Sequence, residues 1–402
     1  MIKLLQQGDY EESLQLAEFA FQRVLSPEDK AARLAAMSGE QIWGWLEEGR
    51  LAAQLSVLPL QFWVGGQVWD MGGIAFVSTW PEYRRKGMIG RLLGASLAAM
   101  HEQGIAWSAL APFSYAFYRK YGWEAGIDYI RYEVPSERLP RPAAAEGSRI
   151  RRVPRDSPVL RQLYMRYARQ FNGMLSRSEG WWATRVFGKK QGMVSVYWSP
   201  SGEAEGYIFY QVREQVLSVH EMVSLTEEAR RGIWRYLSQH DSMISRVLWH
   251  APLDDPWTYL LEEPRVGQEI VPYFMVRIVD VERVFRDYAF VEQTDEEERA
   301  FYIQVEDAQA SWNTGTYRLS PLRPGPDRVQ RLGDQEDRPI AVALPAEASV
   351  LACDIQTLSA LLIGYKSATH LHVAGRLIGE AAEAARLGRY IPATTPFLAD
   401  YF

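Results

Sequence analysis

The feature that most constrains this 402-residue chain is the run Ile74–Gly90, IAFVSTWPEYRRKGMIG, in which an apolar strand leads through a basic loop into a helix. The loop holds Arg84, Arg85, Lys86 and Gly87 directly before the helical pattern. A helix N-terminus presents unpaired backbone N–H groups and a partial positive charge, and a glycine lets the backbone approach an anion closely. The run therefore indicates a strand–helix crossover in a mixed α/β domain, with room for a pyrophosphate at the helix start. The alternative interpretation is an exposed basic turn.

Changes in composition divide the chain into three segments. Pro135, Pro140 and Pro142 surround an Ala-rich run that ends at Gly147, which is typical of a linker. A second boundary lies near Ile278–Val281, at the start of a helix-like stretch. We therefore assign residues 1–140, 141–280 and 281–402 to three domains, in keeping with the length of the chain.

Hydrophobic periodicity predicts the elements of the first segment. Helices are expected over Tyr10–Leu25, Gly87–His101 and Tyr115–Lys120. Strands are expected over Leu51–Leu58, Gln61–Val68, Met71–Val77 and Ile105–Leu110. The first two strands are expected to be joined around Pro59-Leu60, and Gly122 is expected to terminate the last helix.

The second segment repeats this order of elements. Strands are expected over Val194–Trp198, Glu205–Val212, Val216–Val223 and Met243–His250, and a helix over Glu227–Gln239. Val223-Ser224 followed by Arg230-Arg231 echoes Val77-Ser78 followed by Arg84-Arg85, which indicates duplication. Ser224 and Glu227 form a capping-box pattern, so the helix is expected to begin before the arginines and to leave no second cofactor loop.

The third segment is predicted to be a sheet-plus-helix domain, so the whole chain is α+β. Helices are expected over Val281–Tyr288, Ile355–Gly364 and Ala374–Leu387, and strands over Ser311–Leu319, Ala341–Leu344 and Ser349–Asp354. The acidic run Asp295–Glu298 is expected on a solvated face. His370 and His372 alternate as on one face of a strand, but no third ligand is evident, so no metal site is predicted.

Composition narrows the classes of function. The net charge of −6 argues against non-specific binding of nucleic acid. The single cysteine, Cys353, excludes an intrachain disulfide and fits a reducing compartment; its apolar surroundings indicate a buried, inert thiol. No apolar run resembles a signal peptide or approaches the ~18 residues that a membrane span needs. We therefore expect a cytoplasmic protein without a membrane partner.

The loop resembles the acetyl-CoA loop of the GNAT N-acetyltransferases, Arg-x-x-Gly-x-(Gly/Ala), with Arg84, Gly87 and Ile89 in register. Ile89 departs from the usual small residue. That departure, the length of the chain and the ending Asp400-Tyr401-Phe402 make the sequence most similar to the Eis group of acetyltransferases. The resemblance implies tandem GNAT-like domains followed by a sterol-carrier-protein-like domain. It also implies a homo-oligomer, with a hexamer as the suggested size.

The resemblance further implies where acetyl-CoA would bind. Val77, Ser78 and Thr79 would contact pantetheine through the backbone, and a second set would surround the pyrophosphate: Arg85, Lys86, Gly87, Met88, Ile89 and Gly90. Phe113 and Ser114 would lie along the acetyl-bearing arm. The small residues of the family near that position are replaced here by Pro112-Phe113.

Two catalytic groups follow from the same resemblance. Tyr118 matches the general acid of the family, with Tyr115 and Tyr121 as rival acids, and the α-carboxylate of Phe402 matches the general base. The implied substrates are multi-amine compounds such as aminoglycosides, or lysine side chains and polyamines. Asp400 is a candidate for attracting such cations. The competing hypothesis is a lipid- or small-ligand-binding protein whose acetyltransferase domain is inactive.

Overall fold

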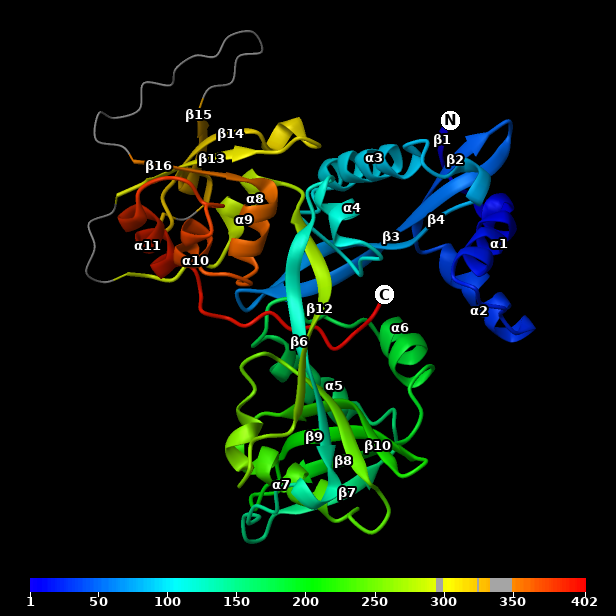
Figure 1. Cartoon of the computed structure of the whole chain (residues 1–402), viewed down its shortest axis with the longest axis vertical. Helices are drawn as coiled ribbons and strands as arrows, with labels where there is room; N and C mark the ends of the chain where they lie inside the picture. The colour runs from blue at the N-terminus through cyan, green and yellow to red at the C-terminus, as the bar shows by residue number, and fades with distance from the viewer. Residues whose placement is uncertain (294–298, 324, 333–348) are drawn as a thin grey trace.

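The computed structural model describes residues 1–293, 299–323, 325–332 and 349–402. Its centre is a twelve-stranded sheet in the order β1-β2-β3-β4-β5-β12-β6-β11-β10-β9-β8-β7. A separate sheet, in the order β15-β14-β13-β16, belongs to the last part of the chain. Figure 1 shows three lobes, with β6 and β12 running from the first lobe into the second.

The elements of the first part alternate strands with helices. Its strands are β1 (Ile2–Leu4), β2 (Gln41–Glu47), β3 (Arg50–Val64), β4 (Gln67–Thr79), β5 (Trp107–Leu110) and β6 (Glu124–Pro135). Its helices are α1 (Tyr10–Ala20), α2 (Pro27–Met37), α3 (Met88–Glu102) and α4 (Tyr115–Arg119). Helix α3 buries Leu92, Leu93 and Leu97 against the sheet, which is the apolar face that the sequence pattern predicted.

The second and third parts follow in chain order. The second holds β7 (Arg149–Val153), α5 (Pro158–Ala168), α6 (Glu179–Trp181), a π-helix (Trp182–Phe187), β8 (Met193–Trp198), β9 (Ala204–Arg213), β10 (Val216–Ser224), α7 (Glu227–Ser238), β11 (Arg246–Ala251) and β12 (Gly267–Ile278). The third holds α8 (Val281–Asp287), β13 (Phe301–Glu306), β14 (Gly315–Leu319), β15 (Val329–Leu332), β16 (Val350–Asp354), α9 (Ile355–Leu362), α10 (Ala368–Val373) and α11 (Ala381–Tyr390).

The first two parts share one sheet because their last strands are exchanged. Strand β12 pairs with β5 from Ile278↔Trp107 to Met275↔Leu110, and it also pairs with β6. Strand β6 in turn pairs with β11 of the second part. Strand β12 of the second part therefore lies between β5 and β6 of the first, and β6 lies between the second-part strands β12 and β11. The sheet is continuous across the boundary predicted near residue 140.

The predicted hairpin turn at Pro59-Leu60 is wrong. Strand β3 continues through both residues and turns instead at Gly65 and Gly66, whose φ angles of 59° and 73° need a residue that tolerates the left-handed region. Strand β2 starts opposite Val57, so the residues of β3 beyond Val57 have no partner on β2. A proline at position 59 of β3 is therefore tolerated.

Two helical predictions also need correction. The helix expected over Tyr10–Leu25 ends at Ala20, and α2 follows, with Ser26 as its N-cap accepting from the Asp29 N–H at 3.1 Å. The helix expected from Ala374 is interrupted by Gly375 and Gly379, both at positive φ, so α11 begins only at Ala381.

The histidine pair lies on a helix and not on a strand. His370 and His372 belong to α10, where residues two apart do not share a face. The predicted strand Ala341–Leu344 and the acidic run Asp295–Glu298 lie outside the described residues. Of the predicted strand Ser311–Leu319, the part from Gly315 onward is strand, preceded by a 3-10 turn.

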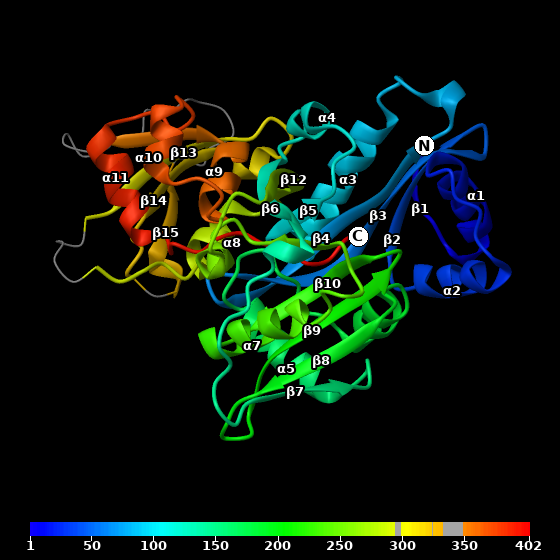
Figure 2. The ribbon, with the colours of Figure 1, turned by 60° about the horizontal axis from the view of Figure 1, so that its bottom comes forward.

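The C-terminal segment returns from the third part to the junction of the first two, as Figures 1 and 2 show. Pro396 forms a parallel bridge with Asn172, whose side chain accepts from the Gly65 N–H and donates to the Ile363 carbonyl, both at 2.8 Å. One asparagine thus ties the tail to all three parts of the molecule. Phe397 and Leu398 follow and are buried.

Candidate active site

The site is built around a gap between two parallel strands of the first part. Strands β4 and β5 pair from Met71↔Trp107 to Ile74↔Leu110, and β5 then ends. Strand β4 continues to Thr79, and on its other edge it stays paired with β3. Phe76 has a φ of 53° at a register shift, so a β-bulge bends β4 at the mouth of the gap.

Val77, Ser78 and Thr79 lie on this free stretch of β4. Ser78 and Thr79 are opposite Gln54 and Ala53 of β3, which occupies one edge of the strand. The backbone groups on the other edge face the gap that β5 has left, so they can pair with an amide-bearing chain. The position predicted for pantetheine is therefore an unpaired strand edge.

The loop after β4 ends in a helix N-terminus open to a ligand. A 3-10 turn (Pro81–Tyr83) is followed by Arg85 at φ 63° and by Gly87 at φ 76°, which is the N-cap of α3. No atom lies within 4 Å of a Cβ built on Gly87, while Arg85 and Lys86 are exposed. The N–H groups of the first turn, Met88, Ile89 and Gly90, have no helical carbonyl before them. This geometry fits a pyrophosphate.

Gly90 joins the loop to the next functional element. A Cβ at Gly90 would collide with the hydroxyl of Tyr121, so only glycine lets this phenol pack against the first turn of α3. Ile89, the departure from the usual motif, is partly buried and packs against the apolar cluster beneath α3. Ile89 thus occupies the motif position at which the family has a small residue, and its side chain serves there in packing.

Tyr118 of helix α4 packs in the apolar cluster that includes Ile74 and Leu110, the last paired residues of β4 and β5. Ser114 is the N-cap of α4, accepting from the Phe117 N–H at 3.3 Å, and Phe113 is 67% exposed beside the helix. The Tyr118 ring is buried among aromatic rings, with ring centroids 5.2 Å from Phe113 and 5.1 Å from Phe117. Burial raises the pKa of Tyr118 above its ordinary value, and the Tyr401 phenol of the tail raises it further.

The two rival tyrosines point to other surroundings. The Tyr115 hydroxyl is buried, and burial followed by the charge of Asp128 raises its pKa to about 12. Tyr121 packs against Gly90, and its carbonyl is held by an arginine.

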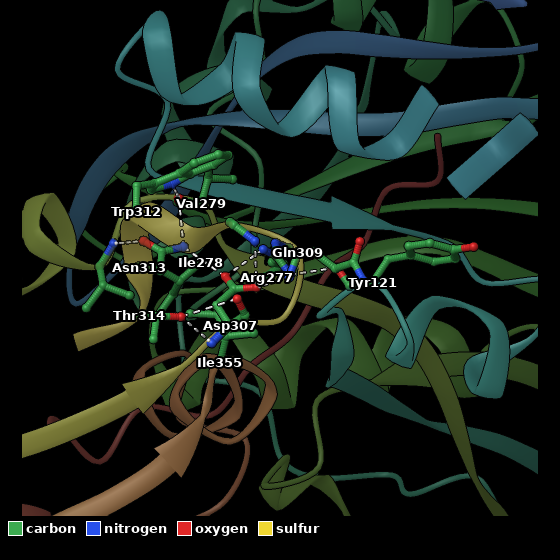
Figure 3. A network of polar contacts seen from close by, with 12 residues as sticks. Tyr121, Arg277, Ile278, Val279, Asp307, Gln309, Trp312, Asn313, Thr314 and Ile355 are labelled. Carbon is green, nitrogen blue, oxygen red and sulfur yellow. Dashed lines mark hydrogen bonds and ion pairs between the residues drawn. The ribbon is translucent and has the colours of Figure 1, made fainter. Parts of the chain in front are cut away.

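A buried arginine network, shown in Figure 3, holds the end of α4. Arg277 of β12 donates to the Tyr121 carbonyl at 2.6 Å and to the Asp307 carboxylate at 2.7 Å, and both charged groups are fully buried. Gly122, at φ 90°, makes room for the guanidinium, since a Cβ there would collide with it. The sequence analysis did not find this network, because its members lie far apart in the chain.

Phe402 packs where β4 of the first part meets β12 and α6 of the second. Its ring lies 4.7 Å from Phe274 and 6.3 Å from Trp181, measured between ring centroids. A Cβ on Gly73 would come within 2.9 Å of the Phe402 ring, so this glycine of β4 provides the docking surface. Gly73 lies three residues before the bulge at Phe76, and Phe402 is buried against it. The tail therefore ends beside β4, close to the point where β5 ends.

Asp400 does not face a substrate cation. Its carboxylate is buried and accepts from Arg177 Nε at 2.9 Å and from Trp181 Nε1 at 2.9 Å. A carboxylate already paired with a buried guanidinium has little charge left to attract an amine. The expectation that Asp400 attracts the acceptor is therefore replaced by a role in holding the tail.

The second part lacks a comparable phosphate loop. Strands β10 and β11 pair from Val216↔Arg246 to Ser218↔Leu248, but α7 begins only two residues after β10. The N-cap is Thr226, accepting from Ala229 N–H at 3.1 Å, and not Ser224, which ends β10. Arg230 and Arg231 lie within α7. The conclusion that the helix precedes these arginines holds, although the predicted cap was wrong.

The described residues contain neither a cluster of metal-ligand side chains nor a membrane-spanning helix. No three His, Cys, Asp or Glu side chains gather there as metal ligands would. Among the described helices, none combines the length and the apolar character needed to cross a membrane. Cys353 is buried, and burial raises the pKa of its thiol to about 12, as expected of an inert cysteine.

Comparison with known proteins identifies all three parts. Residues 1–126 and residues 173–278 each match a model described as an acetyltransferase (GNAT) domain. Residues 281–399 match a sterol carrier protein domain. An uncharacterized N-acetyltransferase of Streptomyces avermitilis is 27% identical, with 94% of this chain and 92% of that protein covered.

Solved structures share the whole architecture. A protein of Enterococcus faecalis described as a probable N-acyltransferase is 28% identical, with a TM-score of 0.89 over 100% of this chain and 99% of its own. Eis1 of Mycobacterium abscessus is 19% identical and shares the fold, with a TM-score of 0.78 over 100% of both chains. With two acetyltransferase domains followed by a sterol carrier protein domain, the protein is an N-acetyltransferase of the GNAT family, and it has the whole-chain fold of Eis1.

Proposed function

We propose that this protein transfers the acetyl group of acetyl-CoA directly to a primary amine. The observation that carries the proposal is the arrangement around β4: its edge beyond Ile74 is not paired with β5, Tyr118 is buried in the apolar cluster that contains Ile74 and Leu110, and Phe402 packs on Gly73. No one of these features would be decisive alone. Together they supply a binding edge, an acid and a base within a single desolvated site.

Val77, Ser78 and Thr79 would pair with the pantetheine amides through the backbone. The pyrophosphate would lie against the first turn of α3, near Arg85 through Gly90, with the charges of Arg85 and Lys86 beside it. The Ser114 side chain is engaged as the N-cap of α4, whereas Phe113 is exposed. This pair would therefore contact the acetyl-bearing arm of the cofactor through the Phe113 ring. Bound acetyl-CoA supplies a thioester, whose carbonyl is open to attack by an amine.

The proton steps belong to two groups of this chain. The α-carboxylate of Phe402 would take a proton from the acceptor ammonium, and the free amine would form the new C–N bond as the C–S bond breaks. Tyr118 would give its proton to the departing thiolate. Burial that keeps Tyr118 protonated also raises the basicity of a thiolate in the same site.

The acceptor class is proposed from the resemblance, and the surface around the tail bears on it. We propose multi-amine compounds such as aminoglycosides, with lysine side chains and polyamines as alternatives. A groove beside Phe402 includes Gln61, Asp70, Ser176, Ser178 and Trp181 in its lining. Asp70 is the acidic side chain of this groove and would attract one ammonium group.

One observation favours a second acceptor class. The guanidinium of Arg185 lies 5.4 Å from the ring of Trp181, so this cation borders an aromatic residue of the site. Burial, and then the charge of Arg185, lowers the pKa of Lys189 to about 8. Amines that carry a carboxylate or phosphate therefore belong in the substrate panel.

The test is release of the CoA thiol from acetyl-CoA with four groups of acceptors: aminoglycosides, polyamines, lysine peptides and anionic amines. Turnover with any group, lost in both Tyr118→Phe and the chain without Phe402, supports the proposed function. Absence of turnover together with absence of acetyl-CoA binding in calorimetry overturns it. The cytoplasmic location and the homo-oligomer belong to the same proposal, and gel filtration with light scattering tests the latter.

The competing lipid-carrier function has less support from the structure. In the third part, the side chains of Phe301 and Tyr390 pack at 5.4 Å, and Arg386 lies 3.5 Å from the Phe301 ring. Leu351, Leu358 and Leu387 are buried in the same core. This packing favours an architectural role, in which the third part sends the tail into the first.

A further inference from the structure

The C-terminal tail reaches the active site through two fixed points, Asp400 and Phe402. Between them, the Tyr401 side chain is 63% exposed, and its ring lies 6.2 Å from that of Tyr273 and 6.1 Å from that of Phe274. The Asp400 carbonyl accepts from the Tyr273 hydroxyl at 2.9 Å. A chain terminus normally frays unless it is tied down, so the contacts of Asp400 decide where the last carboxylate lies.

Asp400 is held by an arginine of the second acetyltransferase domain. Arg177 Nε donates to both carboxylate oxygens of Asp400, at 2.9 and 3.1 Å, and the other guanidinium nitrogens donate to Glu221. The guanidinium lies flat over Tyr164, with its carbon 3.7 Å from the ring centroid. Trp181 Nε1 and the Tyr164 hydroxyl add hydrogen bonds to Asp400, at 2.9 and 3.3 Å.

This cluster is closed to water and balanced in charge. The Arg177 side chain is 0% exposed, and the Asp400 and Glu221 side chains are each 3% exposed. Burial would raise the pKa of Glu221, but the charges of Arg177 and Lys190 outweigh it and lower that pKa to about 2. A buried guanidinium that loses one partner leaves an uncompensated charge, so the cluster favours one geometry strongly.

We propose that the Asp400–Arg177 pair is a latch that positions the α-carboxylate of Phe402 for catalysis. Asp400 is then a positioning residue, since it acts through Phe402, and this part of the inference rests on the proposed function. The latch also gives the second acetyltransferase domain a function. The described residues of this domain form no phosphate loop, but its Arg177, Trp181 and Glu221 fix the position of the carboxylate that the first domain uses as its base.

The first experiment measures docking of the tail without any catalysis. Carboxypeptidase releases Phe402 only when the tail leaves its site, so the rate of release reports the latch. We expect slow release from the wild type and at least about tenfold faster release from Asp400→Asn, because an amide pairs weakly with a guanidinium. Trp181→Phe, which removes one hydrogen bond and keeps an aromatic ring, should fall between them.

The matched control is Asp307→Asn, which weakens the other fully buried arginine–aspartate pair. That pair lies away from the tail, so release of Phe402 should stay at the wild-type rate at a temperature well below unfolding. Wild-type release from Asp400→Asn would overturn the latch. Equally fast release from Asp307→Asn would overturn it as well, because general loosening would then explain the effect.

The second experiment separates positioning from folding by kinetics. Asp400→Asn should lower kcat about tenfold or more, because a displaced base loses its reach, with the KM for acetyl-CoA changed less than about twofold. In a chain that lacks Phe402, Asp400→Asn should cause no additional loss. Additive losses would show that Asp400 acts independently of Phe402 and would overturn the latch. If no amine is acetylated by the wild type, the proposed function fails, while the carboxypeptidase result still decides whether the tail is latched.

Discussion

The two acetyltransferase domains have the same strand–helix–strand order but use it differently. In the first, the loop from Trp80 to Gly87 separates β4 from α3 and leaves an exposed helix N-terminus. In the second, Leu225 and Thr226 alone separate β10 from α7. The space beyond the β10–β11 pairs holds a cavity of about 90 Å³ whose lining includes His250 and residues 397–399 of the tail.

The gap between β4 and β5 faces the loop that we propose for the cofactor, whereas the corresponding region between β10 and β11 lies under the tail. In the proposed function, the first domain presents the site and the second positions the segment that completes it. Each variant below is designed to break or sharpen that division.

Removal of Phe402 should have the largest effect. The loss of a general base lowers kcat by about 100-fold or more, measured as release of the CoA thiol. Extension of the chain by one glycine is the matched control, because it keeps the Phe402 ring and displaces only the terminal carboxylate. If the extended chain retains full activity, the carboxylate is not the base and the ring serves only for packing.

Tyr118→Phe should have the next largest effect. Without its hydroxyl the thiolate leaves unprotonated, so kcat should fall about 10- to 100-fold at a nearly constant KM for acetyl-CoA. Tyr115→Phe, on the same helix, should stay within about threefold of the wild type. A larger loss from the Tyr115 variant would reverse the assignment of the acid.

Removal of charge from the two loops should distinguish the domains directly. Arg85→Ala combined with Lys86→Ala should weaken binding of acetyl-CoA about tenfold in calorimetry, because two cations beside the pyrophosphate are lost. Arg231→Ala, within α7, should leave binding unchanged. Equal weakening by both variants would indicate a second cofactor site in the second domain and contradict the comparison.

The smallest effect is expected at Asp255, in the lining of the cavity of the second domain. Burial raises the pKa of Asp255 to about 6, although a hydrogen bond from the Trp257 N–H opposes the shift. The folded state thus holds this proton more tightly, so wild-type stability falls as pH rises from about 4 towards about 6. Asp255→Asn should reduce that fall by about 1–2 kcal/mol in urea unfolding at several pH values. An unchanged pH dependence would show that the carboxyl is hydrated.

Local sequence patterns predicted much of the fold and, of the candidate site, the loop at the start of α3. The spacing of apolar residues located α3 and α7, and the Arg-Arg-Lys-Gly loop marked the start of α3. These predictions succeed because helix periodicity, capping and the conformational freedom of Gly87 depend on residues within one or two turns. The prediction of a hairpin turn at Pro59 failed because pairing with β2, which starts opposite Val57, decides whether that proline can lie in a strand.

The sequence by itself therefore determined the elements, the phosphate loop and, through its resemblance, the identity of Tyr118 and Phe402 as candidates. Only the tertiary structure decided that Phe402 docks on Gly73, that Asp400 pairs with Arg177, and that Arg277 and Asp307 hold the end of α4. The reason is physical. A buried charge needs a partner, and the partner is chosen by packing between segments hundreds of residues apart, which no local pattern records.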